Sequence, residues 1–365
     1  MAIAEFQPET QPLEHPKPLA GDRRTKARLL RFMLLALLGL TMLMGLGWGA
    51  AGDTDVIAAL LAKFGIGEAR LVDMTVVWDI RMPRVLTGAL VGAALAVAGA
   101  VMQGLFRNPL ADPGLVGVSA GAGFGAVAAI VLGGLLPLAL QNLVGAYLVP
   151  LAAFFGGWIS TLVLYKIATR GGRTSVATML LAGIALGALT GALTGFIVYK
   201  ATDDQLRDLT FWGMGSVAGA TWAKLLTAGP IIALALITAP FLARALDALA
   251  LGEAVASHMG IDTQRMKRIA ILSVAGSVGA SVAITGGIGF IGIVVPHLLR
   301  LVQGPEHRNL LPNAALLGAI MLLLADMVSR LAVAPAELPI GIVTACLGGP
   351  FFLWILLKNR ALLES

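Results

Sequence analysis

The sequence predicts an all-α membrane protein that crosses the bilayer several times, and three observations support this prediction. Hydrophobic residues make up 58% of the 365 residues and charged residues only 13%, whereas an average soluble chain carries roughly 25% charged residues. Long charge-free runs recur along the chain, and a helix needs about 20 apolar residues to cross the hydrocarbon core. The 45 glycines suit helices that pack closely in lipid. The composition excludes a soluble globular protein, and the single cysteine, Cys346, excludes a disulfide framework or a multi-cysteine metal cluster.

The charge-free runs locate the predicted spans. In chain order these are Phe32–Gly52, Val85–Phe106, two spans within Pro113–Tyr165, Ser175–Tyr199, Leu225–Ala243, the run Ile269–Leu299, Asn309–Ala332 and Leu338–Leu357. The run from 113 to 165 is too long for one helix, and glycines, prolines and polar residues at 133–150 divide it. Small residues spaced four apart, such as Gly117, Gly121 and Gly125, predict close helix packing.

The number of spans depends on how the run Ile269–Leu299 is read. As one helix it gives nine spans, and as a helix, a turn at Gly286–Gly289 and a short helix it gives ten. Ten spans put both basic chain ends, and 18 of the 26 Lys and Arg residues, on the cytoplasmic side, as the positive-inside rule requires. We therefore predict ten transmembrane helices with both termini cytoplasmic. The eighth span, about Phe290–Val302, is then a short half-helix, which protein must cover.

The remaining composition narrows the possible functions. Residues 1–30 form a polar, proline-containing tail for which we expect disorder, and the apolar run that follows is too long for a cleavable signal peptide. The net charge of +6 is explained by membrane topology rather than by nucleic-acid binding.

No P-loop motif occurs, so the chain has no ATPase site of its own. Asp326 is the one good candidate for a buried acid on a transport path, and pairing with Arg330, one turn away, is the favoured alternative.

A cytoplasmic loop at about 245–262 carries apolar residues outside the bilayer, and Gly252 and Gly260 divide it into two predicted short helices. Glu253 stands in the first turn of the second helix, where a carboxylate suits the helix dipole. The apolar face needs cover, and packing against the chain's own helices or against a partner would both supply it.

Four motifs resemble the permease family of ABC importers for iron-siderophores, haem and vitamin B12. They are RMPR at 81–84, GAVMQGLFRNPLADPG at 99–114, GGIGFIGIVVPHLLR at 286–300, and the pair ELPIG at 337–341 with GGPF at 348–351. The resemblance implies a permease domain over residues 31–360 that forms a homodimer in the bacterial inner membrane. It also implies two separate ATPase subunits, which bind ATP and Mg, and a periplasmic substrate-binding protein. This chain itself then has no catalytic residue, metal or cofactor.

The same resemblance assigns roles to individual residues. It places the cytoplasmic gate at Asn108, Leu110, Thr174 and Ser175. It places the contact with the ATPase at Leu249, Gly252, Glu253, Ala254, Met259 and Gly260. It gives docking of the binding protein to Arg81, Arg84 and Arg330. The alternative to the gate assignment is ordinary helix capping by Asn, Thr and Ser. The alternative to the docking assignment is that the arginines snorkel to lipid headgroups.

Two further segments predict the transported substrate. The segments DDQLRDLTFWGMGSVAGATW at 203–222 and GPEHR at 304–308 resemble the haemin branch of the family, so haem is expected as substrate. Ferric siderophore and cobalamin follow as alternatives. No histidine lies in the predicted outer half, so no axial haem ligand is expected there. A secondary carrier of a hydrophobic solute is the alternative from another class, and an intramembrane enzyme lacks the paired carboxylates or Ser/His set that it would need.

Overall fold

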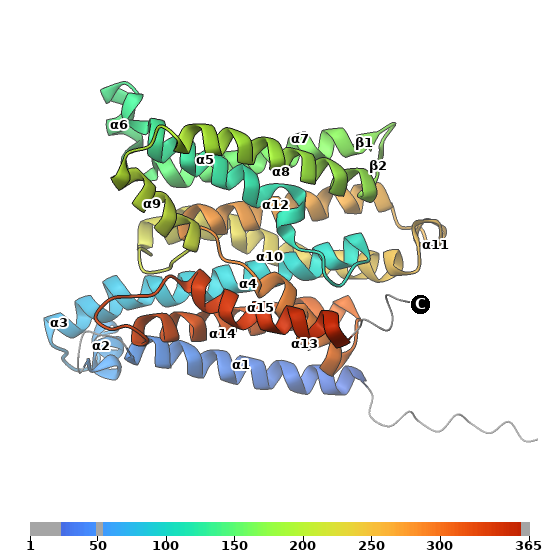
Figure 1. The fold of residues 1–365 in the computed structure, drawn as a ribbon. Helices are drawn as coiled ribbons and strands as arrows, with labels where there is room; N and C mark the ends of the chain where they lie inside the picture. Colours follow the sequence, from blue (N-terminus) through green and yellow to red (C-terminus); the bar gives the residue numbers. More distant parts are fainter. Residues whose placement is uncertain (1–22, 49–53, 359–365) are drawn as a thin grey trace, which may run out of the picture.

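The computed structural model describes residues 23–48 and 54–358, which fold almost entirely into helices (Figure 1). The elements of the first half are α1 (Arg23–Gly47), α2 (Val56–Lys63), α3 (Leu71–Met74), the π-helix η1 (Thr75–Arg81), α4 (Met82–Phe106), η2 (Pro113–Val116), α5 (Val118–Leu132), η3 (Gly133–Leu135), α6 (Leu138–Val144), η4 (Gly145–Tyr147) and α7 (Leu148–Ala168). The remaining elements are β1 (Thr169–Arg170), β2 (Arg173–Thr174), α8 (Val176–Val198), α9 (Asp203–Met214), α10 (Trp222–Ala250), α11 (Glu253–His258), α12 (Thr263–Thr285), α13 (Ile291–Gln303), α14 (His307–Leu331) and α15 (Ile340–Lys358).

The predicted spans coincide with long helices. Eight helical segments in the described ranges are long and apolar enough to cross a membrane, and α13 and α15 are shorter apolar helices. The run at 269–299 is broken where its glycines predict, because α12 ends at Thr285 and α13 begins at Ile291. The predicted short eighth helix is therefore present as α13.

Two predicted boundaries are wrong. Helix α1 begins at Arg23, so it extends into the predicted polar tail, whose residues 1–22 lie outside the described part. The first part of α1 packs on α14, where Arg31 donates to Asn309 and Asn313 at 3.1 Å each. The second error concerns the loop at 245–262, where α10 runs unbroken to Ala250 and leaves α11 as the only separate helix of that loop.

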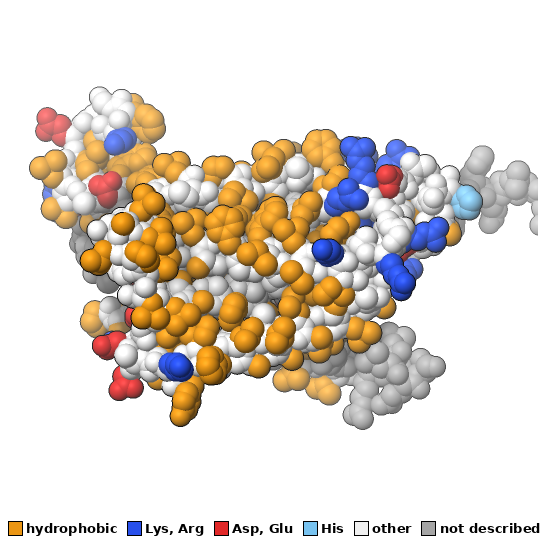
Figure 2. Space-filling model, turned by 90° about the horizontal axis from the view of Figure 1, so that it is seen from above, with side chains coloured by type: hydrophobic (Ala, Val, Ile, Leu, Met, Phe, Trp, Pro, Cys, Tyr) orange, Lys and Arg blue, Asp and Glu red, His pale blue; other side chains and the backbone are white. Residues whose placement is uncertain are grey.

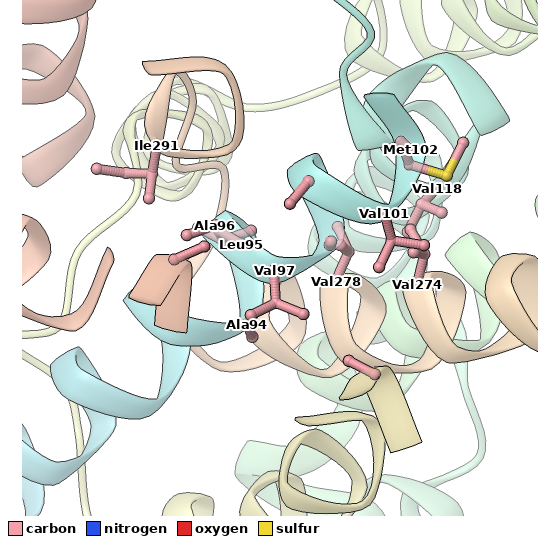
Figure 3. Packing of buried hydrophobic residues seen from close by; sticks show 14 of the residues in the cluster. Ala94, Leu95, Ala96, Val97, Val101, Met102, Val118, Val274, Val278 and Ile291 are labelled. Atoms are coloured by element: carbon pink, nitrogen blue, oxygen red, sulfur yellow. The ribbon is translucent and has the colours of Figure 1, made fainter. Parts of the chain in front are cut away.

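Helix α4 forms the centre of the bundle. The most apolar window of the segment Leu71–Phe106, which contains α4, has 83% of its residues buried inside the chain. The corresponding window of α8 has only 6% of its residues buried. Figure 3 shows side chains of α4 surrounded by Val118 of α5, Val274 and Val278 of α12, and Ile291 of α13. Because α8 has so little cover in this chain, it lies at the edge of the bundle.

Glycine pairs let neighbouring helices approach closely, as the spacing predicts. A methyl group on Gly99 of α4 would overlap the backbone of Gly292 in α13, and one on Gly121 of α5 would overlap Gly156 in α7. Such contacts bring polypeptide backbones together where a larger residue would hold them apart.

The face drawn in Figure 2 is hydrophobic in the middle and differs in charge between its two ends. In Figure 2, hydrophobic side chains cover the middle of the molecule, and Lys and Arg gather at the end that carries β1, β2 and α11 in Figure 1. We call this the basic end. The opposite end carries α2, α3, α6 and α9.

Candidate functional site

The loop after α10 forms a short protruding helix at the basic end. Gly252 has φ 110° and directly precedes α11, and Gly260 has φ 77° and follows α11. Both conformations suit glycine, because a Cβ would strain them. Ala256 of α11 is fully buried, whereas Glu253 and Ala254 of the same helix, and Met259 and Gly260 after it, are exposed. Leu249 differs from this exposed group, since its side chain is buried in the bundle.

A second element of the basic end is the hairpin between α7 and α8. Its strands pair Thr169 with Thr174, and the turn uses Gly171 and Gly172, both with positive φ. The buried Thr174 shares a 2.9 Å hydroxyl–hydroxyl hydrogen bond with Thr169. Ser175 caps α8, because its hydroxyl accepts from the backbone N–H of Thr178 at 3.2 Å. The capping interpretation of Ser175 is therefore confirmed, and its gate role stays a prediction.

The third element is the turn that ends α4. Arg107 takes a left-handed conformation with φ 50°, and the Asn108 side chain accepts from the backbone N–H of Leu110 at 2.9 Å. Asp112 accepts from the N–H of Gly114 at 2.7 Å and so caps η2. Burial raises the pKa of the Asp112 carboxyl.

These three elements meet around one small cavity. Its volume is about 250 Å³, and its lining residues are Leu105, Phe106, Arg107, Ser175, Val176, Ala177, Leu249 and Glu253. The structure thus brings the end of α4, the start of α8 and the loop around α11 to one place. Of the residues predicted for the gate and the ATPase contact, it brings Ser175, Leu249 and Glu253 together at this cavity, whereas Asn108 and Leu110 lie in the adjoining turn.

Lys267 of α12 connects two of these elements, and the sequence analysis missed it. Its ammonium lies 2.5 Å from a carboxylate oxygen of Glu253 and donates to the carbonyl of Thr174 at 3.0 Å. The side chain is only 2% exposed. One feature of the sequence indicates that Lys267 is buried. It lies three, four and seven residues before Ala270, Ile271 and Val274, so it shares their buried face of the helix.

At the opposite end, the three arginines predicted for docking are buried. Arg81 donates to the carbonyls of Leu46 and Gly47, at 2.6 and 2.8 Å. Arg330 donates to the carbonyls of Gly45 and Trp48, at 3.1 and 3.2 Å. The last carbonyls of a helix lack partners within the helix, so these arginines cap the end of α1.

Arg84 joins the same group of side chains through two carboxylates. It binds Asp326 at 2.8 Å and Glu337 at 2.9 Å, and Asp326 also pairs with Arg330 as predicted. The hydrogen bond from Arg84 lowers the pKa of the Glu337 carboxyl. All three arginines are therefore engaged within their own chain, and their role towards a partner stays a prediction.

A cavity of about 350 Å³ lies deeper in the bundle. It is bordered by α4, α5, α9, α12 and the glycine turn before α13, through Leu95, Asp112, Pro113, Gly114, Ser119, Trp212, Gly213, Val278, Val282, Gly287, Ile288, Gly289, Phe290 and Gly292. Asp112 therefore borders the same cavity as Leu95 of α4, a position that the sequence did not predict for it. Across residues 23–48 and 54–358, no three His, Cys, Asp or Glu residues group as a metal site would require.

Comparisons with known proteins agree with this architecture. The model of the FecCD transport family matches residues 33–358. The hemin transport system permease protein HmuU of Yersinia pestis is 43% identical over 331 residues, which cover 90% of this chain and 96% of HmuU. The vitamin B12 import system permease protein BtuC of Salmonella paratyphi A is 45% identical over 340 residues, which cover 93% of this chain and 97% of BtuC. A solved structure described as an inward-facing conformation of a metal-chelate type ABC transporter aligns with a TM-score of 0.78 at 32% identity, over 91% of this chain and 99% of that one.

Proposed function

The chain belongs to the FecCD transport family, and from this membership we propose that it forms the translocation path of a binding-protein-dependent ABC importer for haem. The observation that carries the proposal is the near-complete match to two import permeases, HmuU and BtuC. The chain is a multi-pass membrane protein of the ABC permease type. ATP hydrolysis is then the task of a separate subunit that binds ATP and Mg.

Topology follows from the distribution of charge. The basic end faces the cytoplasm, because Lys and Arg concentrate on that side of a membrane protein. With α13 and α15 included as spans, the bundle crosses the bacterial inner membrane ten times and both termini are cytoplasmic. The thinly covered helix α8 packs against a second copy of the chain, which makes the working unit a homodimer.

The partners occupy the two ends of the bundle. Two ATPase subunits bind the basic end through the exposed residues of α11, while Asn108, Leu110, Thr174 and Ser175 form the cytoplasmic gate beside it. The periplasmic binding protein docks on the opposite end, near Arg81, Arg84 and Arg330. For this contact, the arginines must exchange some of their internal partners for carboxylates of the binding protein.

Haem is the proposed substrate because the segments 203–222 and 304–308 resemble the haemin branch. BtuC is as similar overall as HmuU, so ferric siderophore and cobalamin are the alternatives. A secondary carrier, which would need no ATPase subunit, is the alternative from another class.

The test is transport by the reconstituted complex. The permease is purified with its ATPase, placed in proteoliposomes, and supplied with binding protein loaded with haemin, a ferric siderophore or cobalamin. We expect ATP-dependent accumulation of haemin at least tenfold above that of the other two. Equal or greater uptake of cobalamin or siderophore would reassign the substrate, and uptake by the permease alone without ATP would support the secondary carrier.

A further inference from the structure

Lys267 is buried although it carries a charge. Its side chain is 2% exposed, and lysine is almost never fully buried unless it is paired. Two groups from different elements surround its ammonium, namely the Glu253 carboxylate of α11 and the Thr174 carbonyl of β2. Both must stay close to the ammonium, because a buried charge that loses its partners is strongly destabilised.

The backbone of Thr174 is held from both sides by α12. Its carbonyl accepts from Lys267 at 3.0 Å, and its N–H donates to the side chain of Gln264 at 2.9 Å. Gln264 and Lys267 are three residues apart, so they share one face of the helix. Thr174 is followed directly by Ser175, the cap of α8. The first turns of α12 therefore fix where α8 begins.

Glu253 provides the connection to α11. It is the first residue of that helix, where a carboxylate is favoured by the helix dipole. Its side chain is 47% exposed, whereas that of Lys267 is 2% exposed. Glu253 therefore reaches from the surface of the basic end to a buried cation, and that cation holds the segment before α8.

We propose that Lys267 is the positioning residue through which a displacement of α11 is transmitted to Thr174 and to the start of α8. This inference rests on the proposed function, in which α11 receives the motion of the ATPase and the start of α8 belongs to the gate. When α11 moves, the buried ammonium follows the Glu253 carboxylate and carries the Thr174 carbonyl with it, because separation from either would leave a buried polar group unpaired.

The experiment compares Lys267→Met with Arg265→Met in the full complex with ATPase and binding protein. The Met side chain keeps the length of lysine without its charge. Arg265 lies two residues away on α12, is exposed, and its side chain makes no hydrogen bond or ion pair in the described part of the chain, so it is a matched control. Uptake per ATP hydrolysed is measured in proteoliposomes together with co-purification of the ATPase. We expect Lys267→Met to lower uptake per ATP at least tenfold with normal co-purification, and Arg265→Met to leave it within twofold.

A distance measurement gives a readout that a merely structural role would not change. With Cys346 replaced by serine, spin labels at Ser257 on α11 and Arg173 on β2 report whether the two elements move together between nucleotide-free and ATP-bound complexes. In wild type we expect the separation to stay constant as both elements shift. In Lys267→Met we expect it to change with nucleotide.

The outcomes separate this inference from the proposed function. Wild-type uptake per ATP in Lys267→Met, or an unchanged label separation in that variant, would overturn the role of Lys267. If the complex with Lys267→Met does not assemble, Lys267→Gln is measured in its place, because it retains a hydrogen-bond donor without the charge. Wild-type uptake per ATP in Lys267→Gln would then overturn the role of Lys267. Failure of the wild-type chain to bind an ATPase would instead refute the proposed function.

Discussion

The buried cluster at the opposite end allows a quantitative prediction, because one arginine binds two carboxylates that differ in exposure. Arg84 donates to Asp326, whose side chain is 1% exposed, and to Glu337, whose side chain is 37% exposed. Asp326 also pairs with Arg330. Replacing Asp326 with asparagine removes the negative charge that lies between two buried guanidinium groups.

The expected cost follows from this geometry. Removing one partner of a buried ion pair costs about 3–5 kcal/mol, so Asp326→Asn should lower the free energy of unfolding by about that amount. Glu337→Gln breaks a pair that is open to solvent on one side, and exposed pairs contribute roughly 0–1 kcal/mol. Both variants remove a carboxylate charge from Arg84, and Asp326→Asn also removes the partner of the buried Arg330. The larger loss is therefore expected for Asp326→Asn, because its charge is buried between two guanidinium groups.

The assay is reversible unfolding of the permease in mixed micelles of increasing denaturing detergent, followed by circular dichroism. The wild type, Asp326→Asn and Glu337→Gln are compared at the same micelle composition. Equal destabilisation by the two variants, or a loss below about 1 kcal/mol in Asp326→Asn, would refute the reasoning from burial.

The ion pair between Arg84 and Glu337 also predicts how the stability of the fold changes with pH. The Arg84 guanidinium lowers the pKa of Glu337 in the folded chain, so the pair stabilises the fold above the unfolded pKa of about 4.3. This contribution is lost as the pH falls through the lowered folded pKa. In Glu337→Gln, the loss of stability in that acidic range should be smaller than in the wild type.

Four further predictions concern packing, gating and docking. Gly99→Ala should destabilise the bundle by about 1–3 kcal/mol in the same unfolding assay, because its methyl group would meet the backbone of Gly292, whereas Gly123→Ala meets nothing within 4 Å and should be neutral. Ser175→Trp should abolish uptake in proteoliposomes with dimer and ATPase still assembled, and full transport would end the gate assignment. Gly260→Trp should release the ATPase subunits by steric exclusion, so co-purification at normal stoichiometry would contradict the proposed dock. Association of the binding protein, measured on nanodiscs, should slow as salt rises and slow further in Arg81→Glu, and a rate indifferent to both would leave that arginine a purely structural cap.

Local sequence features predict most of the helical framework. Charge-free runs of about 20 residues predict spans, and the glycines before Phe290 predict the break that leaves α13 short. Helix boundaries depend on more than these local features. The alanine-rich continuation of α10 contains no residue that ends a helix before Gly252, so the predicted first short helix of the loop is simply the end of α10.

Motifs predicted the individual residues of the candidate site, but they did not predict which of these residues lie together in space. Ser175 comes from one stretch of sequence and Leu249 and Glu253 from another, and all three border one cavity. In the sequence, Lys267 is one of several basic residues on the predicted cytoplasmic side. Its burial depends on how α11 and β2 pack against α12, and no local pattern states that packing.

The sequence by itself determined that this chain is a helical membrane protein, where its spans lie, and to which family it belongs, because these depend on hydrophobicity, glycine spacing and contiguous motifs. Only the tertiary structure decided which charges are used internally. Arg81, Arg84 and Arg330 look from the sequence like an outward basic patch, yet they cap α1 and share Asp326 and Glu337 within the chain. The physical reason is that the partner of a charged side chain is set by distances between residues up to 285 positions apart, which arise only when the helices pack.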